Sequence, residues 1–194
     1  MDLIHHLVAR AADDVRIFRD DVDRTNYLES LGGVTERYGW RCLAYCLMRN
    51  HTHLLVEATR ADLRVGQRRL RQAHAHQLGV RHGVSDAVWR TGARAVRIRN
   101  DQQLWAVAAY IAANPVDAGL CIEASRYRWS SHAATIGAAE GPPWLASADL
   151  LTLLCGSSDA TARRRYALYV AERGRRRRPA AEDYGAQQVS VSAG

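Results

Sequence analysis

The sequence predicts an α+β fold of the ferredoxin-like (RRM-like) class, built on a split βαβ sheet. Apolar runs of strand length alternate with stretches whose apolar residues recur every three or four positions. These segments follow the order strand, helix, strand, strand, helix, strand, which is the order of the split βαβ arrangement. Because one more helical stretch follows the last strand, we expect an additional helix beside the sheet.

The first half of the chain contains three expected strands. Residues 3–9 are an apolar run of strand length, and a helix with apolar positions over 27–38 follows aspartates that are typical of a helix start. Residues 40–48 are almost continuously apolar, which is typical of a strand buried on both faces. The polar pair at 49 and 50 separates this strand from the run 51–57, so a hairpin is expected.

The second half is expected to be mostly helical. A helix over 61–78 has leucines on its inner face, and a fourth strand is expected around 89–98. Asn100 and Gln103 resemble a capping box at the start of a third helix, which Pro115 is expected to end. A short helix and then an arginine-rich helix and tail follow.

The composition is that of a globular protein, with 47% apolar and 24% charged residues. All 27 basic residues are arginine, and the formal net charge is +7. Guanidinium groups suit planar contacts with phosphate, so this charge favours nucleic acid or another polyanion as partner without choosing between them. Because no apolar stretch has the length of a membrane helix and the start does not resemble a signal peptide, a cytoplasmic location without membrane contact is expected.

Two histidines stand one residue apart at the start of the strand 51–57. On a strand, residues i and i+2 point to the same side about 6.6 to 7 Å apart, which lets the imidazoles of His51 and His53 converge on one ion. A pair of ordinary histidines at a strand end is the alternative. If the segment is a strand, zinc shared with Cys42 and Cys46 is rejected, because four residues of strand separate those sulfurs by roughly 13 Å. They are then expected to be core thiols.

The third helix carries a tyrosine and an asparagine on one face. Tyr110 and Asn114 are spaced i, i+4, so a phenol hydroxyl and an amide oxygen can enter one cleft. A half-buried core tyrosine and a helix terminator before Pro115 are the simpler interpretations. The adjacent Ser131 and His132 do not form a catalytic relay.

Four segments carry a resemblance to a known family: IFRDDVDRTNYLESL, AYCLMRNHTHLLVE, AYIAANPVDAGL and RYRWSSH. In this order and spacing, they resemble the single-tyrosine HUH transposases of insertion sequences and the REP-associated tyrosine transposases, over about residues 3–135. The usual pattern there is A-Y-x-x-M-P-N-H-x-H-L-L-V followed by Y-I-x-x-N-P-V-x-A-G-L. The resemblance implies a ferredoxin-like enzyme with an additional catalytic helix, which cuts and rejoins single-stranded DNA near a hairpin.

The resemblance also implies a role for each matching residue. Tyr110 would be the nucleophile, and its attack would leave a 5′-phosphotyrosine and a free 3′-hydroxyl. His51, His53 and Asn114 would hold a divalent cation, Mg²⁺ or Mn²⁺, that offsets charge developing at the scissile phosphate. The partner would be a single-stranded DNA hairpin, and the oligomeric state is left open between a monomer and a homodimer.

Seven arginines are expected to contact the DNA backbone, with a solvated helix face and strand edge as the alternative. One of them, Arg49, stands where the family has proline. Gly92 and Ala93 stand where relatives have an arginine and an aromatic residue, and this departure bears on DNA binding rather than on the metal site. The seven are Arg49, Arg64, Arg68, Arg71, Arg94, Arg97 and Arg99.

With this resemblance, the chain is expected to divide into a transposase-like catalytic domain (1–140), a C-terminal helical extension (141–172) and a disordered arginine-rich tail (173–194). The alternative function is a catalytically silent, domesticated protein that binds DNA hairpins on the same fold. The presence of all four matching site residues argues against it. A generic RNA-binding module ranks last, because the chain has one phenylalanine and lacks the aromatic RNA-binding signature.

Overall fold

A computed structural model describes residues 3–12, 16–84, 88–90 and 94–176. None of the helices in these ranges is long and apolar enough to cross a membrane. In chain order the elements are β1 (Leu3–Arg10), α1 (Asp21–Tyr38), β2 (Arg41–Leu47), β3 (His51–Ala58), α2 (Arg60–His82), β4 (Arg94–Arg97), α3 (Asp101–Asp117), the 3₁₀ helix η1 (Ala124–Arg126), α4 (His132–Thr135), α5 (Ser147–Cys155) and α6 (Ala160–Arg176).

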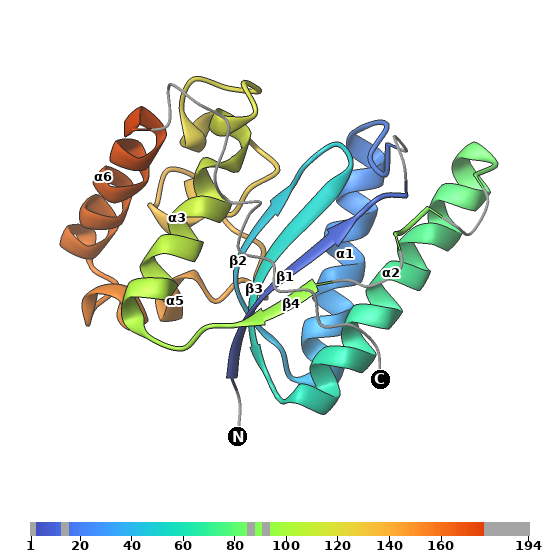
Figure 1. Cartoon of the computed structure of the whole chain (residues 1–194), viewed down its shortest axis with the longest axis horizontal. Helices are drawn as coiled ribbons and strands as arrows, with labels where there is room; N and C mark the ends of the chain where they lie inside the picture. The colour runs from blue at the N-terminus through green and yellow to red at the C-terminus, as the bar shows by residue number, and fades with distance from the viewer. Residues whose placement is uncertain (1–2, 13–15, 85–87, 91–93, 177–194) are drawn as a thin grey trace, which may run out of the picture.

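The four strands form one sheet in the order β2-β3-β1-β4. Every pairing is antiparallel, with β1 between β3 and β4 and with β2 beside β3. This is the split βαβ order, so the predicted ferredoxin-like α+β fold is confirmed. Helices α1 and α2 cover one side of the sheet, and α3, α5 and α6 lie on the other side (Figure 1).

Both faces of the sheet are buried, because successive strand residues point into different cores. Leu54 and Val56 belong to the core beneath α1 and α2, whereas Leu55 belongs to the core beneath α3. On β2 the pairing register shifts between Cys42 and Ala44, and a bulge of this kind re-aims the side chains that follow it. The prediction that 40–48 is buried on both faces therefore holds for β2.

Helix α3 continues through Pro115, so the prediction that this proline ends the helix is wrong. A proline lacks only its own N–H donor, and the residues after it can still donate. The Ala118 N–H bonds the Asn114 carbonyl at 3.0 Å, and the Leu120 N–H bonds the Pro115 carbonyl at 2.8 Å. The helix consequently reaches Asp117, which leaves Asn114 inside it.

Three other boundaries differ from the expected ones. Helix α2 runs on to His82, where Gly83 ends it with a positive φ of 64°. The strand expected around 89–98 is described only as β4, and Gly92 and Ala93 lie outside the described residues. Residues 173–176, expected in the tail, are the last turn of α6.

The C-terminal helices share a core with α3. Tyr166 and Val170 of α6 and Leu150 of α5 are buried in the cluster that contains Leu104 and Ile111 of α3. The Tyr166 hydroxyl also donates to the Ala108 carbonyl at 3.2 Å. The extension therefore packs along the helix that carries Tyr110.

Candidate functional site

The two paired histidines lie where β3 begins, directly after the hairpin turn. The Met48 N–H bonds the His51 carbonyl at 2.9 Å, which closes the predicted hairpin and fixes where the strand starts. The His51 and His53 rings both lie on the α3 side of the sheet, with centroids 4.9 Å apart. Because His53 is only 1% exposed, it is a buried polar side chain rather than a surface histidine at a strand end.

Helix α3 brings the tyrosine and the asparagine to the same face. The Tyr110 ring meets the His53 ring edge-on, with centroids 5.2 Å apart. Asn114 is 8% exposed, and its side chain hydrogen-bonds to that of His51. The structure therefore brings the four residues together from β3 and α3, and Asn114 faces the histidines instead of terminating the helix.

In each histidine of the pair, Nδ1 takes part in a hydrogen bond. His51 Nδ1 lies 2.8 Å from Oδ1 of Asn50, and His53 Nδ1 lies 3.0 Å from Nε2 of His6. His53 Nε2 is buried and has no hydrogen-bond partner. An imidazole held through one nitrogen, with a free lone pair on the other, is the usual arrangement of a metal-binding histidine.

These histidines are neutral at physiological pH. Burial, aided by the positive charge of Arg10, lowers the pKa of His51 to about 4, although the hydrogen bond with Asn114 acts in the opposite direction. Burial also lowers the pKa of His53 well below its ordinary value, with smaller contributions from His6 and His51. Neutral imidazoles can bind a cation without first losing a proton.

Two residues of β1 belong to this site, and the sequence did not single them out. His6 contacts His53 directly, and burial followed by the charge of Arg94 lowers its pKa to about 4. Arg10 stands directly opposite His51 in the β1–β3 pairing. The only sequence signal was that residues two apart on a strand share a face. This places His6 and Arg10 together, but only the strand register shows that their face is that of His51 and His53.

The three arginines predicted around β4 do not share one face. Arg94 pairs with Val8 on β1, which puts it on the sheet face of His6. Arg97 pairs with His5 and so points to the opposite face. Arg99 follows the strand, and its backbone N–H bonds the Gln103 side chain at 2.8 Å at the start of α3.

Helix α2, on which the arginine stripe was predicted, lies across the sheet from α3 (Figure 1). Arg64 and Arg68 are exposed there, whereas Arg71 is half-buried. The Arg71 guanidinium packs 6.0 Å from the Trp89 ring and donates to the Arg90 carbonyl at 3.3 Å, so it anchors that segment to the helix. Arg49 is exposed in the hairpin turn.

Helix α6 supplies a further arginine beside the tyrosine. Cζ of Arg173 lies 5.4 Å from the centroid of the Tyr110 ring. About one turn earlier on the same two helices, the Trp105 and Tyr169 rings are in contact, with centroids 4.8 Å apart. Arg173 was expected in the disordered tail, and only the packing of α6 along α3 places it against Tyr110.

The remaining sequence candidates are structural. Cys42 and Cys46 are fully buried on β2, as expected for core thiols. Ser131 Oγ accepts from the Tyr45 N–H at 2.9 Å, and the His132 ring packs against Tyr166 at 5.4 Å. Neither residue is oriented as a relay.

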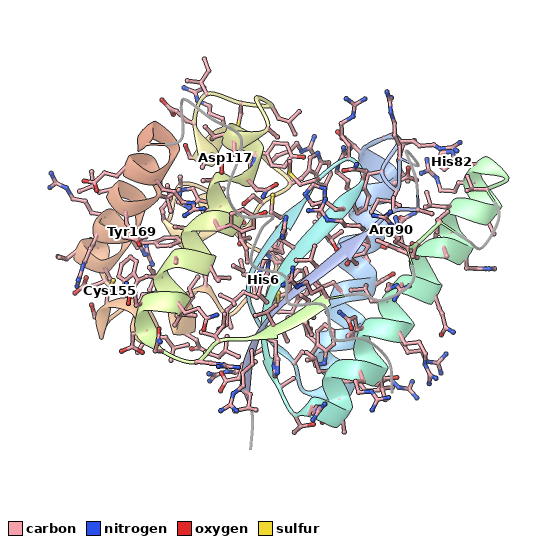
Figure 2. The ribbon with its side chains drawn as sticks, in the orientation of Figure 1. His6, His82, Arg90, Asp117, Cys155 and Tyr169 are labelled. Carbon is pink, nitrogen blue, oxygen red and sulfur yellow. The ribbon has the colours of Figure 1, made fainter. Side chains whose placement is uncertain are left out.

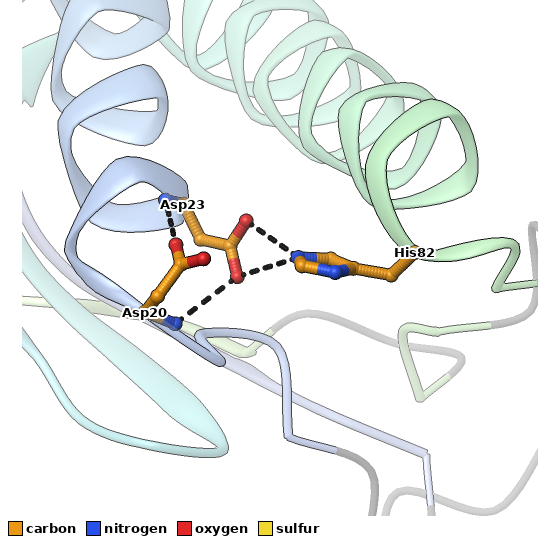
Figure 3. Close-up of side chains that lie close together, drawn as sticks. All are labelled: Asp20, Asp23 and His82. Atoms are coloured by element: carbon orange, nitrogen blue, oxygen red, sulfur yellow. Dashed lines mark hydrogen bonds and ion pairs between the residues drawn. The ribbon is translucent and has the colours of Figure 1, made fainter.

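A second group with ligand-like spacing lies at the junction of α1 and α2 (Figure 3). Asp20, Asp23 and His82 each offer an atom within 4.8 Å of the others. However, Asp23 accepts from His82 Nε2 at 2.9 Å and from the Arg19 N–H at 2.8 Å, and Arg81 pairs with both carboxylates. Because protein donors already occupy these oxygens, we interpret the group as an ion-pair network that joins the helices.

Comparison with one solved structure agrees with the fold. A REP-associated tyrosine transposase, solved bound to a REP hairpin, is 15% identical with a TM-score of 0.62, over 72% of this chain and 82% of that chain. A candidate transposase from Deinococcus radiodurans R1 is 16% identical with a TM-score of 0.43, over 53% of this chain and 84% of that chain. No curated protein matches the sequence.

The family assignment comes from the sequence itself. The model of the family described as "Transposase IS200 like" matches residues 1–114, which is more than half of the 194 residues. The matched segment contains the β3 histidines and most of α3, and it ends at the asparagine that faces them. This chain therefore belongs to the IS200-like transposase family.

Proposed function

We propose that the protein is a metal-dependent transposase that cuts and rejoins single-stranded DNA at hairpins, with Tyr110 as its nucleophile. The observation that supports this most is the meeting of His51 and His53 from β3 with Tyr110 and Asn114 from α3 on one sheet face. Membership of a transposase family supports the same role. The structural neighbour bound to a REP hairpin favours a hairpin as the substrate.

The donor set fits a divalent cation. His51 and His53 offer imidazole nitrogens, Asn114 offers an amide oxygen, and the buried Nε2 of His53 has no hydrogen-bond partner. We propose that these three residues hold Mn²⁺ or Mg²⁺, and imidazole nitrogens favour Mn²⁺ of the two. Such a cation, when bound, polarises a phosphate oxygen as a Lewis acid.

Tyr110 carries out the substitution at phosphorus in this proposal. Its phenol oxygen forms a bond to the scissile phosphorus while the bond from phosphorus to the 3′-oxygen breaks. The phenol proton leaves to solvent, and the departing 3′-oxygen takes up a proton to become a hydroxyl. Because the 5′-phosphotyrosine retains the ester, a 3′-hydroxyl can reverse the step and join strands without ATP.

The arginines around the site would bind the phosphates that flank the cut. Arg10 and Arg94 act electrostatically on the histidines, and Arg173 lies against the Tyr110 ring. Their positive charge would attract a phosphate held beside Tyr110. Arg49 precedes His51 by two residues in the exposed turn. We propose that the other predicted arginines follow the backbone farther from Tyr110: Arg64, Arg68, Arg71, Arg97 and Arg99.

The division of the chain is part of the same proposal. Residues 1–140 would form the catalytic unit, and residues 141–172 would support it. The burial of Tyr166 and Val170 against α3 favours the supporting role of the extension, because α3 carries the proposed nucleophile.

The test is a covalent adduct assay. The protein is incubated with Mn²⁺ and single-stranded hairpins taken from palindromes that flank its coding region, each labelled at the 3′ end, because that end stays on the 5′-phosphotyrosine fragment. A labelled protein band on a denaturing gel is expected. Tyr110→Phe and chelator should each abolish it. Tyr38→Phe, which removes the hydroxyl of a half-buried tyrosine at the last residue of α1, should leave the adduct unchanged.

The alternative of a silent hairpin-binding protein gives a different result in the same assay. It predicts a gel shift under native conditions and no adduct under denaturing conditions. Hairpins that bind tightly and never yield an adduct with Mn²⁺ or Mg²⁺ would refute the enzymatic proposal.

A further inference from the structure

Strand β1 carries two adjacent histidines that point to opposite faces of the sheet. His5 pairs with Val56 and His6 pairs with Leu55 across the β1–β3 ladder. Val56 belongs to the core beneath α1 and α2, and Leu55 belongs to the core beneath α3. His6 therefore lies on the site face, toward α3 (Figure 2), while His5 lies on the other face with its Nδ1 2.9 Å from the Leu3 carbonyl.

His6 contacts both a proposed cation ligand, His53, and the proposed nucleophile, Tyr110. Its Nε2 lies 3.0 Å from Nδ1 of His53, and the two rings stack with centroids 5.2 Å apart and an interplanar angle of 24°. Its ring also meets the Tyr110 ring edge-on at 6.0 Å. Between two neutral imidazole nitrogens at this distance, one donates a proton and the other accepts it.

The direction of this hydrogen bond decides whether His53 can bind a cation. If His6 donates, neutral His53 carries its own proton on Nε2, which is buried without a partner and would then be an unsatisfied donor. If His53 donates from Nδ1, its Nε2 presents a lone pair at the same buried place. Only the second arrangement leaves the nitrogen available for coordination.

We propose that His6 is a positioning residue, whose Nε2 accepts the Nδ1 proton of His53 and so fixes the tautomer and ring orientation that present His53 Nε2 to a divalent cation. The inference rests on the proposed function, because the cation belongs to it. The neighbouring ligand has a comparable partner, since the Asn50 amide oxygen lies 2.8 Å from His51 Nδ1 and can only accept.

An imidazole in this role differs from the carboxylate that often supports a metal-binding histidine. A carboxylate would add a negative charge next to the place where a DNA phosphate must approach. A neutral imidazole that accepts the His53 proton holds the same tautomer without that repulsion. The positive groups nearby, Arg10 and Arg94, are consistent with a site adapted to an anion.

The first experiment needs no metal. Long-range ¹H–¹⁵N correlation spectra of the ¹⁵N-histidine-labelled, metal-free protein distinguish the two ring tautomers of His53. We expect the proton on Nδ1 in the wild type and a mixture of tautomers in His6→Leu. A wild-type His53 protonated on Nε2 would overturn the inference.

The second experiment measures Mn²⁺ affinity by isothermal titration calorimetry. His6→Leu should weaken binding roughly 10- to 100-fold, the usual effect of removing a partner of a metal-binding histidine. His6→Gln should bind nearly as well as wild type, because its amide oxygen reaches the position of Nε2 and accepts the same proton. His6→Asn has the same amide one methylene shorter and should bind as weakly as His6→Leu.

The matched control is His5→Gln, the same substitution one residue away on the opposite face, which should leave the affinity unchanged. Circular dichroism and thermal melting establish that each variant is folded, and the contrast between His6→Gln and His6→Asn separates positioning from a general packing effect. Equal affinity in wild type and folded His6→Leu would overturn the role of His6 alone. A wild type that binds no Mn²⁺ would overturn the proposed metal site and the role of His6 with it.

One more measurement distinguishes positioning from direct coordination. Electron spin echo modulation of bound Mn²⁺ counts the coordinating imidazoles, and we expect two in wild type and two in His6→Gln. Three in wild type and two in His6→Gln would make His6 a ligand and would overturn the positioning role.

Discussion

Two polar clusters that contain histidines lie on opposite sides of the sheet. They differ in whether protein hydrogen bonds occupy their ligand-type atoms. Figure 2 shows His6 from the first between the sheet and α3, and His82 from the second at the end of α2. The site cluster comprises His6, His51, His53, Tyr110 and Asn114. The ion-pair cluster comprises Asp20, Asp23, Arg81 and His82.

The ion-pair cluster has the spacing of a metal site, but protein donors already occupy the oxygens that a cation would need. Asp23, 2% exposed, accepts hydrogen bonds from the backbone at the start of α1 and from Arg81 and His82 at the end of α2. In the site cluster, by contrast, His53 keeps a buried nitrogen without a partner, which costs about 1–3 kcal/mol of stability. A buried nitrogen without a partner that lies beside other ligand-type side chains, rather than short distances alone, therefore distinguishes the candidate cation site from the ion-pair cluster.

The largest stability effect is expected in the ion-pair cluster. Asp23→Ala removes the buried carboxylate that accepts from Arg81, His82 and the Arg19 N–H. It should lower the free energy of unfolding in urea denaturation by about 1.5–3 kcal/mol. Mn²⁺ affinity of the folded variant should not change. Asp21→Ala, whose carboxylate is 59% exposed in its pairs with Arg24 and Arg128, should cost less than about 1 kcal/mol. A loss of Mn²⁺ binding in Asp23→Ala would reverse our assignment of the two clusters.

The sequence predicts the layout of the fold because its periodicities are local. Strand and helix periods, the two-residue turn before His51 and the capping residues before α1 and α3 depend on neighbours in the chain. The spacing of His51 and His53 predicts their common face for the same reason. The roles of Tyr110 and Asn114 rest on the family pattern, because spacing alone favours a core tyrosine and a helix end.

The parts of the site that were missed depend on tertiary packing. The β1–β3 register decides that His6 rather than His5 faces His53, and a shift of one residue would exchange them. Arg173 reaches Tyr110 only because α6 packs along α3. The opposite orientations of Arg94 and Arg97 likewise follow from the pairing of β4 with β1, which no local pattern specifies.

A smaller effect is expected in acid, where buried neutral histidines oppose folding. Burial lowers the pKa of His132 to about 4, against about 6.5 in an unfolded chain, so the unfolded state takes up the proton first and stability falls as the pH drops from about 6.5 toward 4. One such histidine should cost about 2 kcal/mol between pH 7 and pH 5.

His132→Phe isolates this contribution outside both clusters. Urea denaturation at pH 7, 6 and 5 should show a shallower loss of stability with acid in the variant than in wild type. The other buried histidines with lowered pKa values should keep the rest of the acid dependence: His6, His51, His53 and His74. Parallel pH profiles for the two proteins would mean that His132 is not held neutral by burial.

The smallest stability effect is expected where the functional effect is greatest. His6→Leu/His53→Leu removes both partners of the hydrogen bond and the orphaned Nε2 together, and replacing both groups by apolar side chains is close to neutral. The free energy of unfolding should stay within about 1 kcal/mol of wild type, while Mn²⁺ binding is lost. A loss as large as that of Asp23→Ala would mean that the site cluster also holds the fold together. A near-neutral result would mean that these buried histidines contribute little to stability, as expected for groups whose remaining partner is a ligand.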